Sequence, residues 1–386
     1  MTKILIPQVT AERLKAQLNR RHFLALSGAT AAAAFLAACG DDEKKPGTTG
    51  STMGGKVDKN INLFTWADYD DEELLNSWGG LTIDIYGSNE EAIQKLAAAK
   101  GSSGYDVVVP TGVFIPQMVS EDLLQKLDLS KIPNFKNLDV AYTNQAWDQG
   151  NQYSVCKDWG STGFMYDNRV ITTPIVTWAD FLAACEGPAS GQVSVLDTPG
   201  NLCGLYFWAN GIDWTTEDPA HLDAAEDYLV NTLAKHIKAF DSYPGVTLVE
   251  GNYVLSQAWN GDARMGYIAH EGAGGDPADY SWALGGPVTE LWMDNWAIVK
   301  GAPNPDGAHD FINFILDQDN SVKDLEFHGY NTGMADIASL LPDDLPYADM
   351  IFFEDAQVAT MHAGAVNSAQ DRLVEIYNNT KAAAGA

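Results

Sequence analysis

Strand-like runs of apolar residues, some with a period of two, alternate with helix-like segments between residues 60 and 110. Ser88 and Glu91 form a capping box, which marks the start of a helix. The expected strands are 61–66, 81–86 and 105–109, and the expected helices are 70–78 and 88–100. Strands that alternate with helices in this way favour a mostly parallel sheet covered on both faces.

The alternation resumes after an irregular stretch, rich in Asn and Asp, over residues 134–153. Further strands are expected over 159–166 and 192–196, and helices over 177–184, 201–210, 218–239 (one or two helices) and 308–316. The economical interpretation is an α/β protein of two lobes. Ligands are then expected at the carboxyl ends of strands that face the crevice between the lobes.

The first 57 residues predict export and anchoring. Arg20 and Arg21 precede an apolar segment that ends in small residues and Cys39, a pattern typical of a twin-arginine signal with a lipobox. Cleavage leaves Cys39 as a lipidated N-terminus, and the polar segment after it reads as a flexible tether. The expected location is therefore the periplasm or the cell surface, anchored to the membrane. The alternative is an ordinary helix with a chance cysteine.

Acidic residues far outnumber basic ones: 52 Asp and Glu against 23 Lys and Arg give a formal net charge of −29. Such a balance repels nucleic acid and anionic lipid, and it concentrates cations near the surface. No nucleic acid is expected as a partner. The competing interpretation is that this charge serves solubility alone.

Cysteine and histidine usage gives no metal pattern. Besides Cys39, the chain has Cys156, Cys185 and Cys203, and an exported chain allows two of these to form a disulfide, with the third left free. The sequence does not say which two would pair. The seven histidines form no metal-binding motif, so neither a metal nor another cofactor is expected.

Catalytic motifs are absent from the sequence. There is no GxSxG elbow, no phosphate-binding GxxxxGK[ST] loop and no Ser-x-x-Lys set. An exported enzyme remains one of three hypotheses, and turnover of a ligand would identify it.

Indole and phenol rings lie next to carboxylates at three places where strands end, namely residues 66–69, 259–262 and 292–294. A carboxylate holds an ammonium group through charge-assisted hydrogen bonds, and an aromatic face attracts it through a cation–π contact. Together they suit an elongated organic cation. For a single Trp, burial in the core is the simpler explanation, but three such pairs favour a binding site.

These segments resemble the bacterial spermidine/putrescine-binding proteins, the solute receptors of polyamine ABC importers. The similarity runs from about Asn60 to the C-terminus. It includes residues 63–69, 105–110, 124–128, 134–139, 159–163, 178–180, 258–261, 292–294, 311–314 and 329–330. The resemblance implies a type II periplasmic-binding-protein fold, in which each lobe is a mixed, mostly parallel sheet flanked by helices and hinge strands join the lobes.

The resemblance also assigns a set of ligand-binding residues. Trp259 is the ring of the second lobe that stacks on the alkyl chain, Asp294 the carboxylate that receives an amine, and Tyr330 a polar closure near the lip. The full expected set is Trp66, Asp68, Tyr69, Thr111, Thr198, Asn201, Trp259, Asp262, Trp292, Asp294 and Tyr330.

Some positions depart from the family pattern. Thr198 and Asn201 stand where the family typically offers acidic residues, an aromatic after residues 107–110 is replaced in the segment around Thr111, and a polar cleft position corresponds to Ala363. Each desolvated ammonium group needs a partner. We therefore expect a ligand with fewer or differently spaced positive charges than spermidine.

The export pattern and the resemblance together imply a division of the chain, and the resemblance implies its partners. The expected regions are a signal peptide over 1–38, a tether over 39–57, lobe 1 over 58–160 and 293–338, and lobe 2 over 161–292 and 339–386. The leading hypothesis is a monomeric receptor that delivers a polyamine-like cation to an ABC permease. The second is the same fold binding another solute, such as an amino acid derivative or another organic cation.

Overall fold

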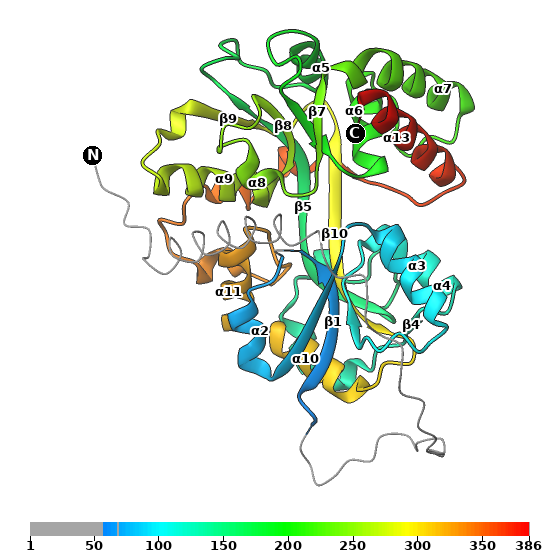
Figure 1. Cartoon of the computed structure of the whole chain (residues 1–386). Helices are drawn as coiled ribbons and strands as arrows, with labels where there is room; N and C mark the ends of the chain where they lie inside the picture. Colours follow the sequence, from blue (N-terminus) through cyan, green and yellow to red (C-terminus); the bar gives the residue numbers. More distant parts are fainter. Residues whose placement is uncertain (1–56, 68, 386) are drawn as a thin grey trace, which may run out of the picture.

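The computed structural model describes residues 57–67 and 69–385 (Figure 1). The expected signal segment, the lipidation site Cys39, most of the tether and the expected ligand residue Asp68 lie outside these residues. Figure 1 shows two α/β lobes, one above the other, with two long strands, β5 and β10, running between them.

The first lobe, the lower one in Figure 1, is built on a sheet in which β1 pairs in parallel with β2 on one side and β3 on the other. Its elements are β1 (Asn60–Trp66), α2 (Glu72–Trp78), β2 (Gly80–Tyr86), α3 (Asn89–Ala99), β3 (Val107–Val108), α4 (Ile115–Ser120), β4 (Leu124–Gln125), α10 (Pro305–Ile315) and α11 (Gln318–His328). Short 3-10 turns cover residues 129–131, 133–137 and 140–142, and the last two overlap the stretch 134–153 that was expected to be irregular.

The second lobe is built on β6, which pairs in parallel with β7 and β8. Its elements are α5 (Trp178–Glu186), β6 (Val193–Leu196), α6 (Pro199–Ala209), α7 (Pro219–Tyr228), β7 (Ile237–Asp241), α8 (Pro244–Thr247), β8 (Leu255–Trp259), α9 (Asn260–Gly272), β9 (Tyr280–Ala283), α12 (Asp355–Val358), β11 (Met361–Ala363) and α13 (Gln370–Ala384). Figure 1 shows the C-terminal helix α13 packed beside α6 and α7.

Two strands belong to both lobes. β5 (Ser154–Asp167) pairs antiparallel with β10 (Thr289–Val299) through Ser161, and from Thr162 onward it pairs with β8 and β9. β10 in turn continues into the first lobe, where it pairs with β3 and β4. β5 is buried along its whole length. Because β5 and β10 pair with each other and each also pairs with strands of a lobe, they connect the two lobes.

Apolar clusters lie on both faces of the first sheet, as expected for an α/β lobe. One contains side chains of α2 and α10, and the other contains side chains of α3 and α4. The second lobe has its own large core, in which Trp178 and Trp208 are buried with ring centroids 4.9 Å apart. The expected two-lobed α/β architecture is confirmed.

Local signals place the starts of the six expected helices to within three residues. The Ser88 hydroxyl accepts a hydrogen bond from the Glu91 N–H at the start of α3, although the Glu91 carboxylate reaches back to the N–H of Gly87. Two expectations are wrong in part. The helical region expected to reach residue 239 ends in a π turn and a 3-10 turn, and β7 begins at Ile237. The strand expected from 159 already begins at Ser154. The charged residues Lys157 and Asp158 gave no sign of a strand in the sequence, although both are buried inside β5.

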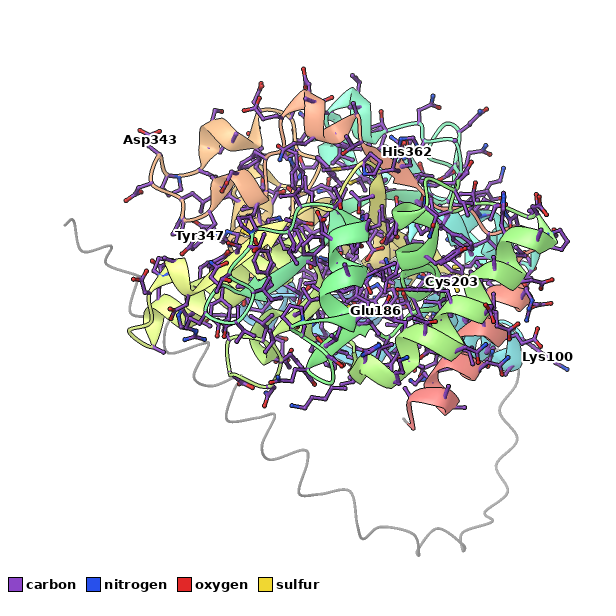
Figure 2. The ribbon with its side chains drawn as sticks, turned by 90° about the horizontal axis from the view of Figure 1, so that it is seen from above. Lys100, Glu186, Cys203, Asp343, Tyr347 and His362 are labelled. Carbon is purple, nitrogen blue, oxygen red and sulfur yellow. The ribbon has the colours of Figure 1, made fainter. Side chains whose placement is uncertain are left out.

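The three described cysteines are free and buried, so the disulfide that the sequence allowed is wrong. Cys156 belongs to a core of the first lobe, whereas Cys185 and Cys203 belong to that of the second (Figure 2 labels Cys203). Burial raises the pKa of the Cys203 thiol to about 12. Within residues 57–385, apart from Asp68, no cluster of His, Cys, Asp or Glu is placed to hold a metal ion. Over the same residues, no helix has the length and apolar character needed to span a membrane.

Candidate functional site

A cleft of about 280 Å³ lies between the two lobes. The first lobe contributes the ends of β1 and β2 and the start of α3, and the second lobe contributes the start of α6, the end of β8 and α9. Ten of the eleven expected ligand residues line this one cleft: Trp66, Tyr69, Thr111, Thr198, Asn201, Trp259, Asp262, Trp292, Asp294 and Tyr330. The eleventh, Asp68, lies outside the described residues.

One strand, β10, runs along the cleft and contributes the five consecutive residues 290–294 to its lining. Glu290, Trp292 and Asp294 alternate along β10, so they share one face of the strand. Four residues of extended chain separate the Cα atoms of Glu290 and Asp294 by about 13 Å. The strand therefore presents a carboxylate near each end of the cleft and an indole between them.

The Asp294 carboxylate is 6% exposed and lies beside a second buried acid. The Tyr69 hydroxyl is 3.1 Å from Asp294 Oδ2 and also contacts Asp158 Oδ1. Because a phenol has one proton, it can donate to only one of these carboxylates at a time. Burial, reinforced by the charge of Asp158, raises the pKa of Asp294 to about 7, against the opposing effect of hydrogen bonds from Thr111 and Tyr69.

A buried charge network stands behind this end of the cleft. Lys157 Nζ lies 2.8 Å from Asp158, 3.5 Å from Asp70 and 3.7 Å from Asp324. His328 Nε2 is 3.3 Å from both Asp158 and Asp324. Burial alone lowers the pKa of Lys157, but its three carboxylate neighbours outweigh that effect and raise it, so the ammonium stays charged.

The other end of the cleft holds Glu290 in a neutral environment. Glu290 Oε2 accepts hydrogen bonds from Thr162 Oγ1 at 2.6 Å and from Asn201 Nδ2 at 2.5 Å. The Thr198 hydroxyl caps α6 and donates to Asn201 Oδ1 at 2.6 Å, which turns the amide nitrogen of Asn201 toward Glu290. Burial raises the pKa of Glu290, and the two hydrogen bonds oppose that shift.

Aromatic rings form the walls between these ends. The Tyr330 hydroxyl donates to Asp262 at 2.5 Å, and its ring meets the Trp292 ring edge to face, with centroids 4.8 Å apart. Glycines make room for both rings. A Cβ at Gly160 would lie 2.5 Å from the Trp292 ring, and one at Gly261 would lie 2.5 Å from the Tyr330 ring. Trp259 is half-buried at the end of β8, where its ring lines the cleft.

Acidic side chains outnumber basic ones in the cleft lining, where His328 is the one basic side chain among the described residues. Four carboxylates line it, those of Glu90, Asp262, Glu290 and Asp294, and no lysine or arginine does so among the described residues. Such a cavity, apolar along its walls and anionic at several points, is chemically suited to an organic cation.

Sequence reasoning missed two of these acids. Glu290 lies two residues before Trp292, so the period of a strand could have placed it on the same face as Trp292 and Asp294. Glu90 lies in the segment 88–100, which was expected only as a helix, although its carboxylate accepts a hydrogen bond at 2.8 Å from Gln370 of the other lobe. A contact across 280 residues leaves no local signal in the sequence.

Known proteins with similar sequences or structures cover most of the chain. The profile of a family described as Bacterial extracellular solute-binding protein matches residues 76–359. "Spermidine/putrescine-binding periplasmic protein 1" of Haemophilus influenzae is 30% identical over 332 residues, which are 84% of this chain and 89% of that protein. The Escherichia coli "Spermidine/putrescine-binding periplasmic protein" is also 30% identical, over 83% of this chain and 91% of its own.

Among solved structures, a "Putative spermidine/putrescine ABC transporter from Listeria monocytogenes" superposes with a TM-score of 0.76 at 26% identity. The superposition covers 84% of this chain and 99% of that one. The fold is therefore that of the solute receptors, and the cleft between the lobes is the feature on which function must be argued.

Proposed function

The chain belongs to the bacterial extracellular solute-binding protein family, and on that basis we propose that it captures a polyamine-like organic cation outside the cytoplasm and delivers it, chemically unchanged, to the permease of an ABC importer. The family consists of solute-binding proteins, not enzymes. The relatives described above are named for binding spermidine and putrescine, which supports a ligand of that class.

The observation that carries the proposal is the composition of the cleft lining. Four carboxylates face it without a lysine or arginine among the described residues, and Trp259, Trp292, Tyr69 and Tyr330 supply its walls. An alkylammonium ion fits both features, because its charge pairs with carboxylates while its methylenes pack on rings. Among the described lining residues an anion would meet one basic side chain, His328, whose Nε2 already faces Asp158 and Asp324.

Capture would work by closing the lobes on the ligand. β5 and β10 are the strands that both lobes share, so a change of angle between the lobes would be absorbed in them. The hydrogen bond between Glu90 and Gln370 joins α3 of the first lobe to α13 of the second at the cleft, and it supports a closed arrangement. Closure excludes water, which strengthens the hydrogen bonds between carboxylate and ammonium groups.

The ligand residues are part of the proposal. Asp294 would receive one ammonium group, with Tyr69 and Thr111 holding its carboxylate in place. Trp259 and Trp292 would contact the alkyl chain, and Tyr330 with Asp262 would close the cleft beside Trp292. Export, the lipid at Cys39, the monomeric state and the permease partner remain predictions from the sequence.

Thermal unfolding and calorimetry with two four-carbon ligands of opposite charge test the proposal. 1,4-Diaminobutane is expected to raise the melting temperature, since a ligand at about 100 times its dissociation constant stabilises the folded state by about 2.7 kcal/mol. Succinate, of matched chain length, should leave it unchanged. Stabilisation by succinate and not by the diamine would overturn the proposal, and mass spectrometry of the recovered diamine would reveal any turnover.

A further inference from the structure

Glu290 has no cationic partner among the described residues. Its two side-chain hydrogen bonds come from a hydroxyl and an amide, and both reach the same oxygen, Oε2. No hydrogen bond or ion pair within the described part of the chain occupies Oε1 in the same way. A carboxylate in a desolvated site is costly unless a cation pairs with it.

The environment nevertheless holds this carboxylate in one orientation. Thr198 fixes the amide of Asn201, Asn201 and Thr162 fix Oε2, and Thr162 is fully buried. Three neutral residues thus hold one acid of the cleft lining in position. Preorganised hydrogen bonds of this kind lower the entropy lost when a ligand binds.

The geometry of β10 relates this acid to the other end of the cleft. Glu290 and Asp294 lie on one face of the strand, about 13 Å apart at their Cα atoms, with Trp292 between them. We propose that Glu290 receives a second ammonium group, so that one strand supplies both anionic ends of the site and selects a diammonium ligand over a monoammonium ligand. This inference rests on the proposed function and specifies the charge pattern of the ligand.

A second ammonium site would change which ligands the cleft prefers, in addition to how tightly it binds them. A ligand with one ammonium group would pair with Asp294 and leave Glu290 without a cation, whereas a ligand with two would satisfy both. An ammonium group at Glu290 would also lower the raised pKa of its carboxyl group and favour the ionised form. Asn201 and Thr198 then act as positioning residues for Glu290.

Calorimetric titration of the full chain with 1,4-diaminobutane and n-butylamine tests the assignment. We expect the wild-type protein to prefer the diamine, and Glu290→Gln to weaken diamine binding by about 10- to 150-fold while butylamine affinity stays within about threefold of wild type. Glutamine keeps the size of the side chain and its ability to accept from Thr162 and Asn201. A selective loss therefore reports the missing charge, not a disturbed fold.

Glu186→Gln is the matched control. Glu186 accepts a hydrogen bond from a neutral hydroxyl, that of Tyr228, as Glu290 does from Thr162, but it lies outside the cleft lining, so the ratio of diamine to monoamine affinity should stay within about threefold of wild type. An equal fall of that ratio in both variants would overturn the role of Glu290, as would a ratio that Glu290→Gln leaves unchanged. If wild type binds both amines equally, the second site is wrong although cation binding stands. If it binds neither, the proposed function itself fails.

Discussion

The two ends of the cleft hold their carboxylates by different means. At one end, Asp294 shares the Tyr69 hydroxyl with Asp158, and a buried network around Lys157 lies directly behind. At the other end, Glu290 is held by two neutral side chains, Thr162 and Asn201. At the first end, the network behind Asp294 also contributes to the stability of the fold. At the second end, the carboxylate of Glu290 has no ionic partner in the part of the chain that the structure describes, so its charge contributes little to that stability. Substitutions at the two ends should therefore separate binding from stability to different degrees.

The largest effect is expected from Lys157→Met. Lys157 is the ammonium that lies among Asp70, Asp158 and Asp324, and its side chain is fully buried. Removing it leaves buried carboxylates without their cation, which typically costs about 3–5 kcal/mol. Urea unfolding followed by tryptophan fluorescence would measure the change in the free energy of unfolding.

Lys381→Met provides the control for this prediction. Lys381 also pairs with a carboxylate, Asp197 at 2.7 Å, but it is partly exposed and lies on α13, away from the network. We expect a loss below about 1 kcal/mol there. Equal losses in the two variants would mean that the network near Asp294 carries no special weight in the stability of the fold.

The next largest effect is expected on ligand affinity in Asp294→Asn. Losing a hydrogen bond to a charged group costs about 1.5–3 kcal/mol, or about 10- to 150-fold in the dissociation constant for 1,4-diaminobutane. Asparagine keeps the shape of the side chain, so calorimetry should show this loss with little decrease in the free energy of unfolding. A variant that binds the diamine as tightly as wild type would remove Asp294 from the site.

The pKa of Asp294 predicts a pH dependence of about tenfold between pH 8 and pH 6. Burial raises the pKa of its carboxyl group to about 7. Lowering the pH therefore protonates the carboxylate that would pair with an ammonium group, and the affinity for the diamine should fall. Asp294→Asn should abolish this part of the pH dependence. An affinity that rises as the pH falls would contradict the assignment.

The same group has an opposite effect on the free protein. Because the pKa of Asp294 in the folded state lies above that of an unfolded Asp, the folded state binds more protons between about pH 4 and 7. Its contribution to stability therefore increases as the pH falls through 7 toward 4. Comparing wild type with Asp294→Asn in urea at pH 5 and pH 8 isolates this contribution, which should vanish in the variant.

The difference between the two ends also marks what the sequence could predict. Trp292 and Asp294 were identified as a ring and a carboxylate at the expected end of a strand. That position is wrong, because both lie inside β10, whose period of two places them on one face. The same local rules predicted five of the eleven strands and six of the twelve α-helices in the described part of the chain. Glu290 obeys the rule too, but no motif drew attention to it, and its hydrogen bond with Asn201 joins residues 89 positions apart.

The buried network could not be predicted in this way. Lys157 and Asp158 read as polar residues before a strand, and Asp70 reads as the first residue of a helix. Their burial depends on Asp324 and His328, which reach them through the path of α11 in three dimensions. A residue pattern reports spacing along one element, whereas the compensation of a buried charge depends on distant elements meeting at one point.

The smallest effect on ligand affinity is expected from Trp259→Leu, which leaves both Asp294 and Glu290 unchanged. Trp259 lies half-buried at the end of β8, and leucine retains apolar contact while removing the ring face. A cation–π contact at such a site contributes about 0.5–1 kcal/mol, so calorimetry with 1,4-diaminobutane should show a loss of about two- to fivefold. Trp259 pairs with Thr162 across β8 and β5, but the hydrogen bonds to the Glu290 carboxylate come from Thr162 and Asn201 and not from the indole, so this loss should be similar in wild type and in Glu290→Gln. A loss that disappears in Glu290→Gln would mean that Trp259 acts through the second end, and a loss of stability without a loss of affinity would mean that its ring serves only the packing of the lobe.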